Sequence, residues 1–150
     1  MTGGEVMYNL NRVEVVFTAQ DSIRVDELAN FLYHVKALYS YLYRTVPEHF
    51  EHVDPQAVET IIQMGEFEQL RKYQRGNLFN RDLGQHDLYV DLIEKRSPLT
   101  IFFICIGSLL ATALVVSGGE LDLSIAPPRI RIIMPPIGDG LAKIKAFFRR

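Results

Sequence analysis

The chain has 150 residues, of which 48% are hydrophobic and 23% are charged, and its formal net charge is −2. This composition is typical of an ordered protein of about one domain and excludes a disordered chain, while the charge provides no overall attraction to nucleic acid, which we do not expect as a partner. The single cysteine, Cys105, excludes a disulfide framework and a cysteine-based metal site.

The first part of the chain contains the pattern of a strand followed by a long helix. Residues 12–18 alternate between apolar and polar side chains, which predicts a half-buried strand. Apolar residues then recur at three- and four-residue steps over residues 28–46. This spacing predicts an amphipathic helix of about twenty residues that begins near Val25 or Asp26 and ends at Pro47.

Four tyrosines lie on this predicted helix without all sharing its leucine-rich face. Aromatic side chains outside a core face are frequent in protein interfaces, so we regard them as candidate interface residues. The alternative is that tyrosine, being half polar, lies along the edge of the helix and over the strands. The four residues are Tyr33, Tyr39, Tyr41 and Tyr43.

A second helix and a second strand are expected before the most apolar part of the chain. Asp54-Pro55 is a favourable helix start, because aspartate accepts hydrogen bonds from free N–H groups and proline at the first helical position loses none. Gly65 predicts a bend or break in this helix. Residues 88–95, LYVDLIEK, alternate with a period of two and predict a strand that leads directly into the next segment.

The most apolar stretch runs from Leu99 to Ser117, nineteen residues without a charge or a proline. As a helix it would approach the roughly 30 Å thickness of the hydrocarbon core of a bilayer. Its large apolar residues would point in every direction, so such a helix must be covered on all sides. We therefore predict a transmembrane helix over residues 98–118. The alternative is a core helix wholly buried in a soluble α+β domain.

Small residues within this predicted span suggest that two copies could approach each other closely in lipid. Gly107 and Ala111 form a small-x-x-x-small pair, the pattern found where transmembrane helices pack together. We therefore expect a homo-oligomer. The residues assigned to this packing are Gly107, Ser108, Ala111 and Thr112.

The last part of the chain combines two extended pieces with a basic amphipathic end. Alternation over residues 120–125 and 129–134 predicts two short strands, in a hairpin-like arrangement, and the flanking prolines argue against a central place in a sheet. The C-terminal residues gather apolar side chains on one side of a short helix, which is typical of membrane-surface binding. Its basic residues are Lys143, Lys145, Arg149 and Arg150. The alternative is that this helix docks on the chain's own sheet.

Candidate catalytic residues are confined to histidines. His49 and His52 lie close together, but no third ligand stands at a diagnostic spacing, so we expect no metal and no cofactor. Arg44-x4-His49 and Arg81-x4-His86 match the loose Arg-x(4–6)-His pattern of metal-independent helical ribonucleases, in which arginine would hold a phosphate and histidine would move a proton. This spacing recurs readily by chance.

Together these features predict an α+β protein with a small head over residues 1–97, a transmembrane helix over 98–118, and an extended segment plus short helix over 119–150. The first 24 residues lack the pattern of a secretory signal, so we expect the head in the cytoplasm. The predicted function is that of a non-enzymatic, single-pass membrane protein in contact with lipid, acting as a self-assembling effector or pore subunit, or as a tethered adaptor whose head binds another protein. The alternatives are a soluble α+β interaction domain and, less favoured, the ribonuclease.

Overall fold

The computed structural model describes residues 10–20, 22–46, 53–65, 67, 70, 78–95, 98–125 and 128–149. The strands among these residues are β1 (Asn11–Phe17), β2 (Tyr89–Glu94), β3 (Leu99–Cys105), β4 (Glu120–Ile125) and β5 (Pro128–Met134). The helices are α1 (Val25–Thr45), α2 (Pro55–Met64), α4 (Gly107–Val116) and α5 (Ile137–Arg149), and the 3₁₀ turn η2 (Gly84–His86) precedes β2. The chain is therefore α+β, as the sequence predicts.

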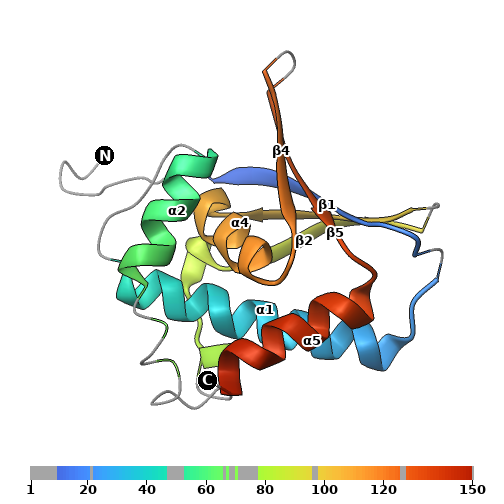
Figure 1. The fold of residues 1–150 in the computed structure, drawn as a ribbon, viewed down its shortest axis with the longest axis horizontal. Helices are drawn as coiled ribbons and strands as arrows, with labels where there is room; N and C mark the ends of the chain where they lie inside the picture. Colours follow the sequence, from blue (N-terminus) through green and yellow to red (C-terminus); the bar gives the residue numbers. More distant parts are fainter. Residues whose placement is uncertain are drawn as a thin grey trace.

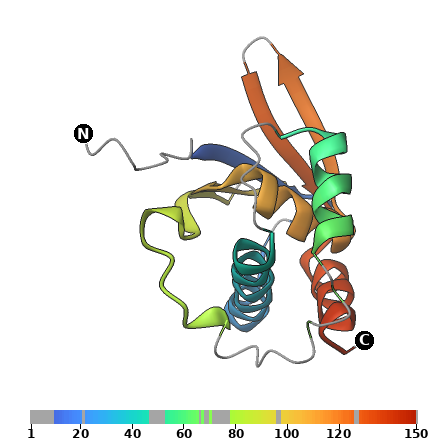
Figure 2. The same ribbon diagram turned by 90° about the vertical axis from the view of Figure 1, so that its left-hand side faces the viewer.

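The strands form one sheet in the order β2-β3-β1-β5-β4. The central strand β1 is antiparallel to β3 and parallel to β5, while β2 and β4 each pair antiparallel with one neighbour and form the two edges. Figures 1 and 2 show the four helices on one side of this sheet, with the β4–β5 hairpin extending beyond them. Strands from all three predicted segments of the chain thus share one sheet.

The core lies between this sheet and the helices, because alternate residues of the central strands point towards the helical layer. On β1 these are Val13, Val15 and Phe17, all fully buried. The register places Val13 opposite Phe103 and Val15 opposite Ile101 on β3, so the apolar faces of neighbouring strands coincide. The alternation predicted for residues 12–18 is confirmed, and this stripe fixes which face of the sheet is covered.

The predicted transmembrane helix is wrong, because the segment Leu99–Ser117 is two elements rather than one. Its first part is the strand β3 and its second part is the ten-residue helix α4. No helix within the described ranges has both the length and the apolarity needed to cross a bilayer. This finding overturns the predicted single-pass topology and the membrane location that was inferred from it.

The break between the two elements has a physical cause at Ile106 and Gly107. Ile106 keeps an extended backbone, and its N–H donates to the hydroxyl of Tyr39 at 2.9 Å. The N–H of Gly107 donates to Oδ1 of Asn11 at 3.2 Å, and a Cβ on Gly107 would lie only 2.7 Å from that oxygen. Glycine is therefore required where α4 begins against β1, and the side chain of Asn11 accepts from one of the free N–H groups of the first turn.

Helix α4 is apolar all round because protein, not lipid, surrounds it. It contacts α1, α2, β1, β4 and β5, and its residues from Gly107 to Leu114 are all buried. The four residues assigned to transmembrane packing, Gly107, Ser108, Ala111 and Thr112, lie within this buried stretch. The hydroxyl of Thr112 donates to the carbonyl of Ser108 at 2.8 Å, so this polar group is satisfied inside the helix.

In the C-terminal part of the chain the predicted hairpin is confirmed, but the prediction that its prolines exclude a central place in the sheet is wrong. β4 and β5 form an antiparallel hairpin, but β5 lies inside the sheet, between β4 and β1. Its prolines allow this position because Pro128 is the first residue of β5 and Pro135 follows its last. Proline is excluded from the middle of an interior strand, not from its ends.

Helix α5 packs against α1. Its residues Leu141 and Ile144 are buried, and the ring of Phe148 lies 5.5 Å from that of His34 on α1. Part of the apolar face of this helix is therefore covered by the chain itself, and contact of its basic residues with a membrane surface stays a prediction. Lys143 is exposed and Lys145 is partly buried. Arg149 ends the helix, and Arg150 lies outside the described residues.

Candidate interaction surface and pocket

The edge strand β2 presents apolar side chains to solvent. Tyr89, Val90, Leu92 and Ile93 are 51%, 45%, 42% and 39% exposed. They account for half of the eight large hydrophobic side chains that are exposed among the described residues. An edge strand also carries unpaired backbone N–H and C=O groups, and together these features make a template for pairing with another strand.

Apolar side chains are exposed on both faces of β2, because the helical layer is centred elsewhere and the strand contains a bulge. Helix α4 contacts β1, β4 and β5, towards the opposite end of the sheet. The pairing of β2 with β3 shifts between Val90 and Leu92, so Asp91 is an extra residue. As a result Val90 and Ile93 face the helical side, opposite Phe103 and Ile101, while Leu92 lies opposite Phe102 on the outer side.

The outer face beside β2 is organised by Arg12. Its Nε lies 2.9 Å from Oδ2 of Asp91, and its guanidinium carbon lies 4.1 Å from the centroid of the Phe102 ring. The ion pair is partly exposed, so it contributes little to the free energy of folding. Its structural consequence is that the carboxylate of the bulge residue is directed back over its own sheet, leaving the free edge of β2 to apolar groups and Glu94.

Helix α1 holds the segment that leads into β2 through three side chains on one face. Lys36 forms an ion pair with Asp87, the hydroxyl of Tyr39 donates to the carbonyl of His86, and Tyr43 Oη is hydrogen-bonded to His86 Nδ1 at 2.9 Å. Positions 36, 39 and 43 follow the three- and four-residue spacing of a helix face. The turn before β2 is therefore fixed to the core, so the edge strand is a preformed surface.

Two ionisable groups in this connection have shifted pKa values. Burial raises the pKa of the Tyr39 hydroxyl above its ordinary value, so it remains a neutral donor and acceptor. Burial also acts to raise the pKa of Asp87, but hydrogen bonds from the Lys36 ammonium and the Leu88 N–H outweigh it and hold that pKa below its ordinary value. Asp87 is therefore a charged anchor at neutral pH.

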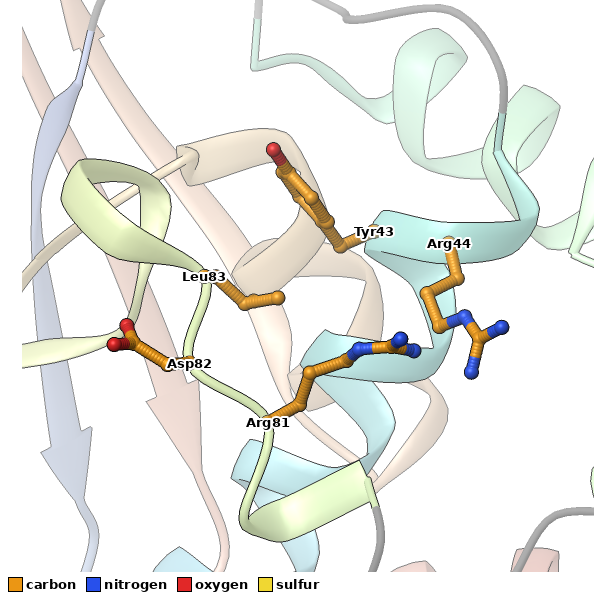
Figure 3. Close-up of a pocket in the computed structure, with 5 residues that line it drawn as sticks. All are labelled: Tyr43, Arg44, Arg81, Asp82 and Leu83. Carbon is orange, nitrogen blue, oxygen red and sulfur yellow. The ribbon is translucent and has the colours of Figure 1, made fainter.

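A pocket opens between the C-terminal end of α1 and the residues before η2. It has a volume of about 410 Å³ and is lined by Tyr43, Arg44, Arg81, Asp82 and Leu83. Figure 3 shows the side chains of Arg44 and Arg81 extending into the same space from opposite elements, with the Asp82 carboxylate turned away from them. Oδ1 of Asp82 accepts the N–H of Gly84 at 2.8 Å.

The predicted interface tyrosines make contacts within the chain. Tyr39 and Tyr41 are fully buried. The ring of Tyr33 stacks on Phe79 at 4.5 Å, and Tyr43 lines the pocket. Their role in contacts with another protein stays a prediction, but the structure places two of the four inside the core.

The structure brings together some of the residues of the two Arg-x4-His matches. Arg44 and Arg81 line the same pocket, and His86 is bonded to Tyr43 on its wall. His49 and His52 lie outside the described residues. Within the described ranges, no three histidine, cysteine, aspartate or glutamate side chains are grouped so that they could hold a metal ion.

Sequence reasoning identified β2 as a strand but missed that it is an exposed edge. One local signal was available: Tyr89 and Ile93 place apolar side chains on the face that the alternation assigns to polar residues, with Asp91 between them. The pocket had no local signal, because Arg44 and Arg81 are 37 positions apart in the sequence.

Comparisons of this chain with protein-family models, with curated proteins and with solved structures gave no significant match. The exposed surface of β2 and the pocket are thus the two candidate sites of function on the described part of the chain.

Proposed function

We propose that this chain is a protein-interaction domain that acts by binding rather than by catalysis, and that it pairs through β2 with β2 of a second copy. The observation that carries the proposal is the exposure of four large apolar side chains on one edge strand. Monomeric proteins usually protect such an edge with charges, proline or a covering segment. Pairing would continue the sheet and cover these side chains.

The bulge restricts how two β2 strands can pair. In an antiparallel dimer the twofold axis is perpendicular to the sheet, so residues that face the helices must lie opposite residues that also face the helices. Among registers that pair four or more residues of β2, only one satisfies this, and it places Val90 opposite Ile93 of the second copy. Shifting the strands by one or two residues brings a helix-facing side chain opposite an outward-facing one.

The charges on β2 are compatible with the same register. Glu94 would lie opposite Tyr89, and Asp91 opposite Leu92, so no two like charges face each other across the pair. Pairing β2 with the other edge, β4, would instead bring Asp91 and Glu94 onto the same face as Glu120 and Asp122. Like charges across strands are destabilising, which favours a closed dimer over an open chain of copies.

The test is the molar mass in sedimentation equilibrium over a range of concentrations. We expect the unmodified chain to associate to a dimer and Ile93→Lys to abolish the association, because the variant places a charge opposite Val90 of the second copy. The matched control is Leu123→Lys on β4, since Leu123 and Ile93 are both 39% exposed. It should leave the dimer intact.

Two results would contradict the proposal. One is a monomer at every concentration of the unmodified chain, which would exclude self-pairing through β2. The other is equal weakening by the two variants, which would indicate association through general surface hydrophobicity rather than through this edge.

A further inference from the structure

The bulge in β2 gives this edge strand an irregular pattern of side chains. Val90 and Ile93 face the helical side, whereas Leu92 faces outwards, and Asp91 is the extra residue between the two halves of the strand. A strand with strict alternation can match the faces of only one half of β2, or must leave Asp91 unpaired, as β3 does. The bulge therefore makes β2 a poor partner for a regular strand.

A second β2 strand matches the whole of this pattern. In the antiparallel register that places Val90 opposite Ile93 of the second copy, Asp91 lies opposite Leu92 of that copy, and the twofold axis repeats this contact in reverse. The two bulges then meet at the same point, and all six residues of β2 keep matching faces. The feature that excludes regular strands thus admits a strand with the same bulge.

Arg12 holds the bulge residue in place from the far side of β3. It lies on β1 opposite Ile104 of β3, on the outer face of the sheet, and its side chain crosses β3 to reach β2. Its Nε lies 2.9 Å from Oδ2 of Asp91, and its guanidinium carbon lies 4.1 Å from the centroid of the Phe102 ring. Contact with the ring orients the guanidinium group, so the ion pair keeps the Asp91 carboxylate on the outer face.

Loss of the bulge would change which residues of β2 face the helices. Strict alternation continued from Val90 would turn Leu92 and Glu94 to the helical side and Ile93 to the outer side. The strand would then be regular and open to pairing with other regular strands. A partly exposed ion pair adds little to the stability of the fold, but a small difference is enough to shift the balance between two pairings of similar free energy.

We infer that Arg12 determines the specificity of self-association, because by fixing the bulge at Asp91 it makes β2 select the bulged β2 strand of another copy over regular strands. The inference rests on the proposed use of β2 as a pairing edge and adds which kind of strand that edge accepts. Arg12 acts through Asp91 and not by contact with the second strand, so it is a positioning residue.

The experiment titrates the isotope-labelled full chain with three end-blocked peptides, and NMR follows the amide shifts of residues 89–94. The first peptide is LYVDLIEK, residues 88–95 of this chain. The second replaces its aspartate with alanine, and the third lacks that residue, so these two have the same charge and differ only in the extra position. We expect the first two to bind alike and the third to bind about fivefold more weakly, because several cross-strand pairs are lost.

Substitution of Arg12 should reduce this preference. In Arg12→Gln, the ratio of the affinities for the alanine peptide and the shortened peptide should fall about two- to fivefold, the range that a partly exposed ion pair allows. Arg12→Lys keeps the charge but loses the forked group, so it should restore only part of the ratio. A general loss of stability would change both affinities together and leave their ratio unchanged.

The matched control is Arg131→Gln on β5. Arg131 is also a partly exposed arginine of the outer face, where it pairs with Glu14 and Asp122, but it does not reach β2. This variant should keep the affinity ratio of the unmodified chain.

Three outcomes would overturn the inference: equal binding of the alanine and shortened peptides by the unmodified chain, an unchanged ratio in Arg12→Gln, and an equal fall of the ratio in Arg12→Gln and Arg131→Gln. Sedimentation of the unmodified chain tests the proposed function separately. A chain that prefers the bulged peptides but stays a monomer would contradict self-pairing and still support the role of Arg12. A dimer without any peptide preference would contradict only this inference.

Discussion

The two edges of the sheet, β2 and β4, have the same length and opposite surface character. Each has six residues and pairs antiparallel with one neighbour. On β4, Glu120, Asp122 and Ser124 alternate with Leu121 and Leu123, so one face of the strand is polar throughout. On β2 the bulge interrupts the alternation, and apolar side chains stand on both faces.

This difference shows how a sheet can protect one edge against pairing with another strand and leave the other edge available for such pairing. Asp122 of β4 lies 3.9 Å from Arg131, which also pairs with Glu14, so the outer face of the hairpin is a row of charges. Alternating charge on an edge discourages pairing with another strand. On β2 the acidic bulge residue is drawn back over the sheet by Arg12, so Glu94 is the one other charge that this strand carries.

The substitution with the largest expected effect on stability tests whether both edges of the sheet depend on the same core. Leu110 is fully buried in α4, so Leu110→Ala should lower the free energy of unfolding by about 2 to 5 kcal/mol through lost contacts and a cavity. Hydrogen exchange should show β2 and β4 losing protection together. Loss of protection in only one edge would show that the two edges belong to separate cooperative units.

A substitution at Tyr39 should have a smaller effect on stability, confined to the β2 side of the sheet. Tyr39→Phe removes the hydroxyl that accepts from the Ile106 N–H and donates to the His86 carbonyl, leaving buried groups unsatisfied. We expect a loss of about 1 to 3 kcal/mol in the free energy of unfolding, with faster amide exchange around residues 84–90 than in β4.

Tyr89→Phe is the matched control for Tyr39→Phe. The Tyr89 hydroxyl donates to the Gly84 carbonyl at 3.1 Å but is exposed, so water replaces the lost bond. Its effect on the unfolding free energy should be within about 0.5 kcal/mol. Equal effects of the two variants would contradict the role given to Tyr39.

The smallest expected effect is the dependence of stability on acid. The pKa of Asp87 is lower in the folded chain than its ordinary value, so the charged carboxylate stabilises the fold above its unfolded pKa of about 3.9. This contribution is lost as the pH falls through the lower, folded pKa. Asp87→Asn should therefore flatten the fall in stability below about pH 4.

The partner in this ion pair provides a second variant for the same measurement. Lys36→Gln removes the ammonium whose hydrogen bond lowers the pKa of Asp87. Urea unfolding at pH values from about 2 to 7 should show the same reduced slope as in Asp87→Asn. An unchanged slope in both variants would mean that other groups cause the acid dependence.

Local patterns predicted the elements that depend on local forces. The alternation of β1, the helix over Val25–Thr45 and the start of α2 at Asp54-Pro55 are confirmed, and Oδ1 of Asp54 accepts the Ala57 N–H at 2.8 Å. Strand β2 and helix α5 were also predicted. These features need only side-chain periodicity and capping, which the sequence displays within a few residues.

The predictions that were wrong concern segments whose structure is decided by the residues packed around them. A continuous apolar run is compatible with a bilayer or with a strand and a helix enclosed by protein, and periodicity alone does not distinguish them. Over Leu99–Cys105 the β-branched and aromatic residues favoured a strand, whereas leucine and alanine dominate Gly107–Val116. The contact of Asn11 with Gly107 and the convergence of Arg44 with Arg81 depend on tertiary structure.

Cross-linking at one pair of positions tests directly whether β2 pairs with β2 of a second copy in a single register. Chains carrying Val90→Cys and chains carrying Ile93→Cys are mixed and treated with a short thiol cross-linker, since the only native cysteine, Cys105, is buried. We expect mixed dimers to form rapidly, while either variant alone and Leu123→Cys cross-link slowly. Equal rates for all of these would contradict it.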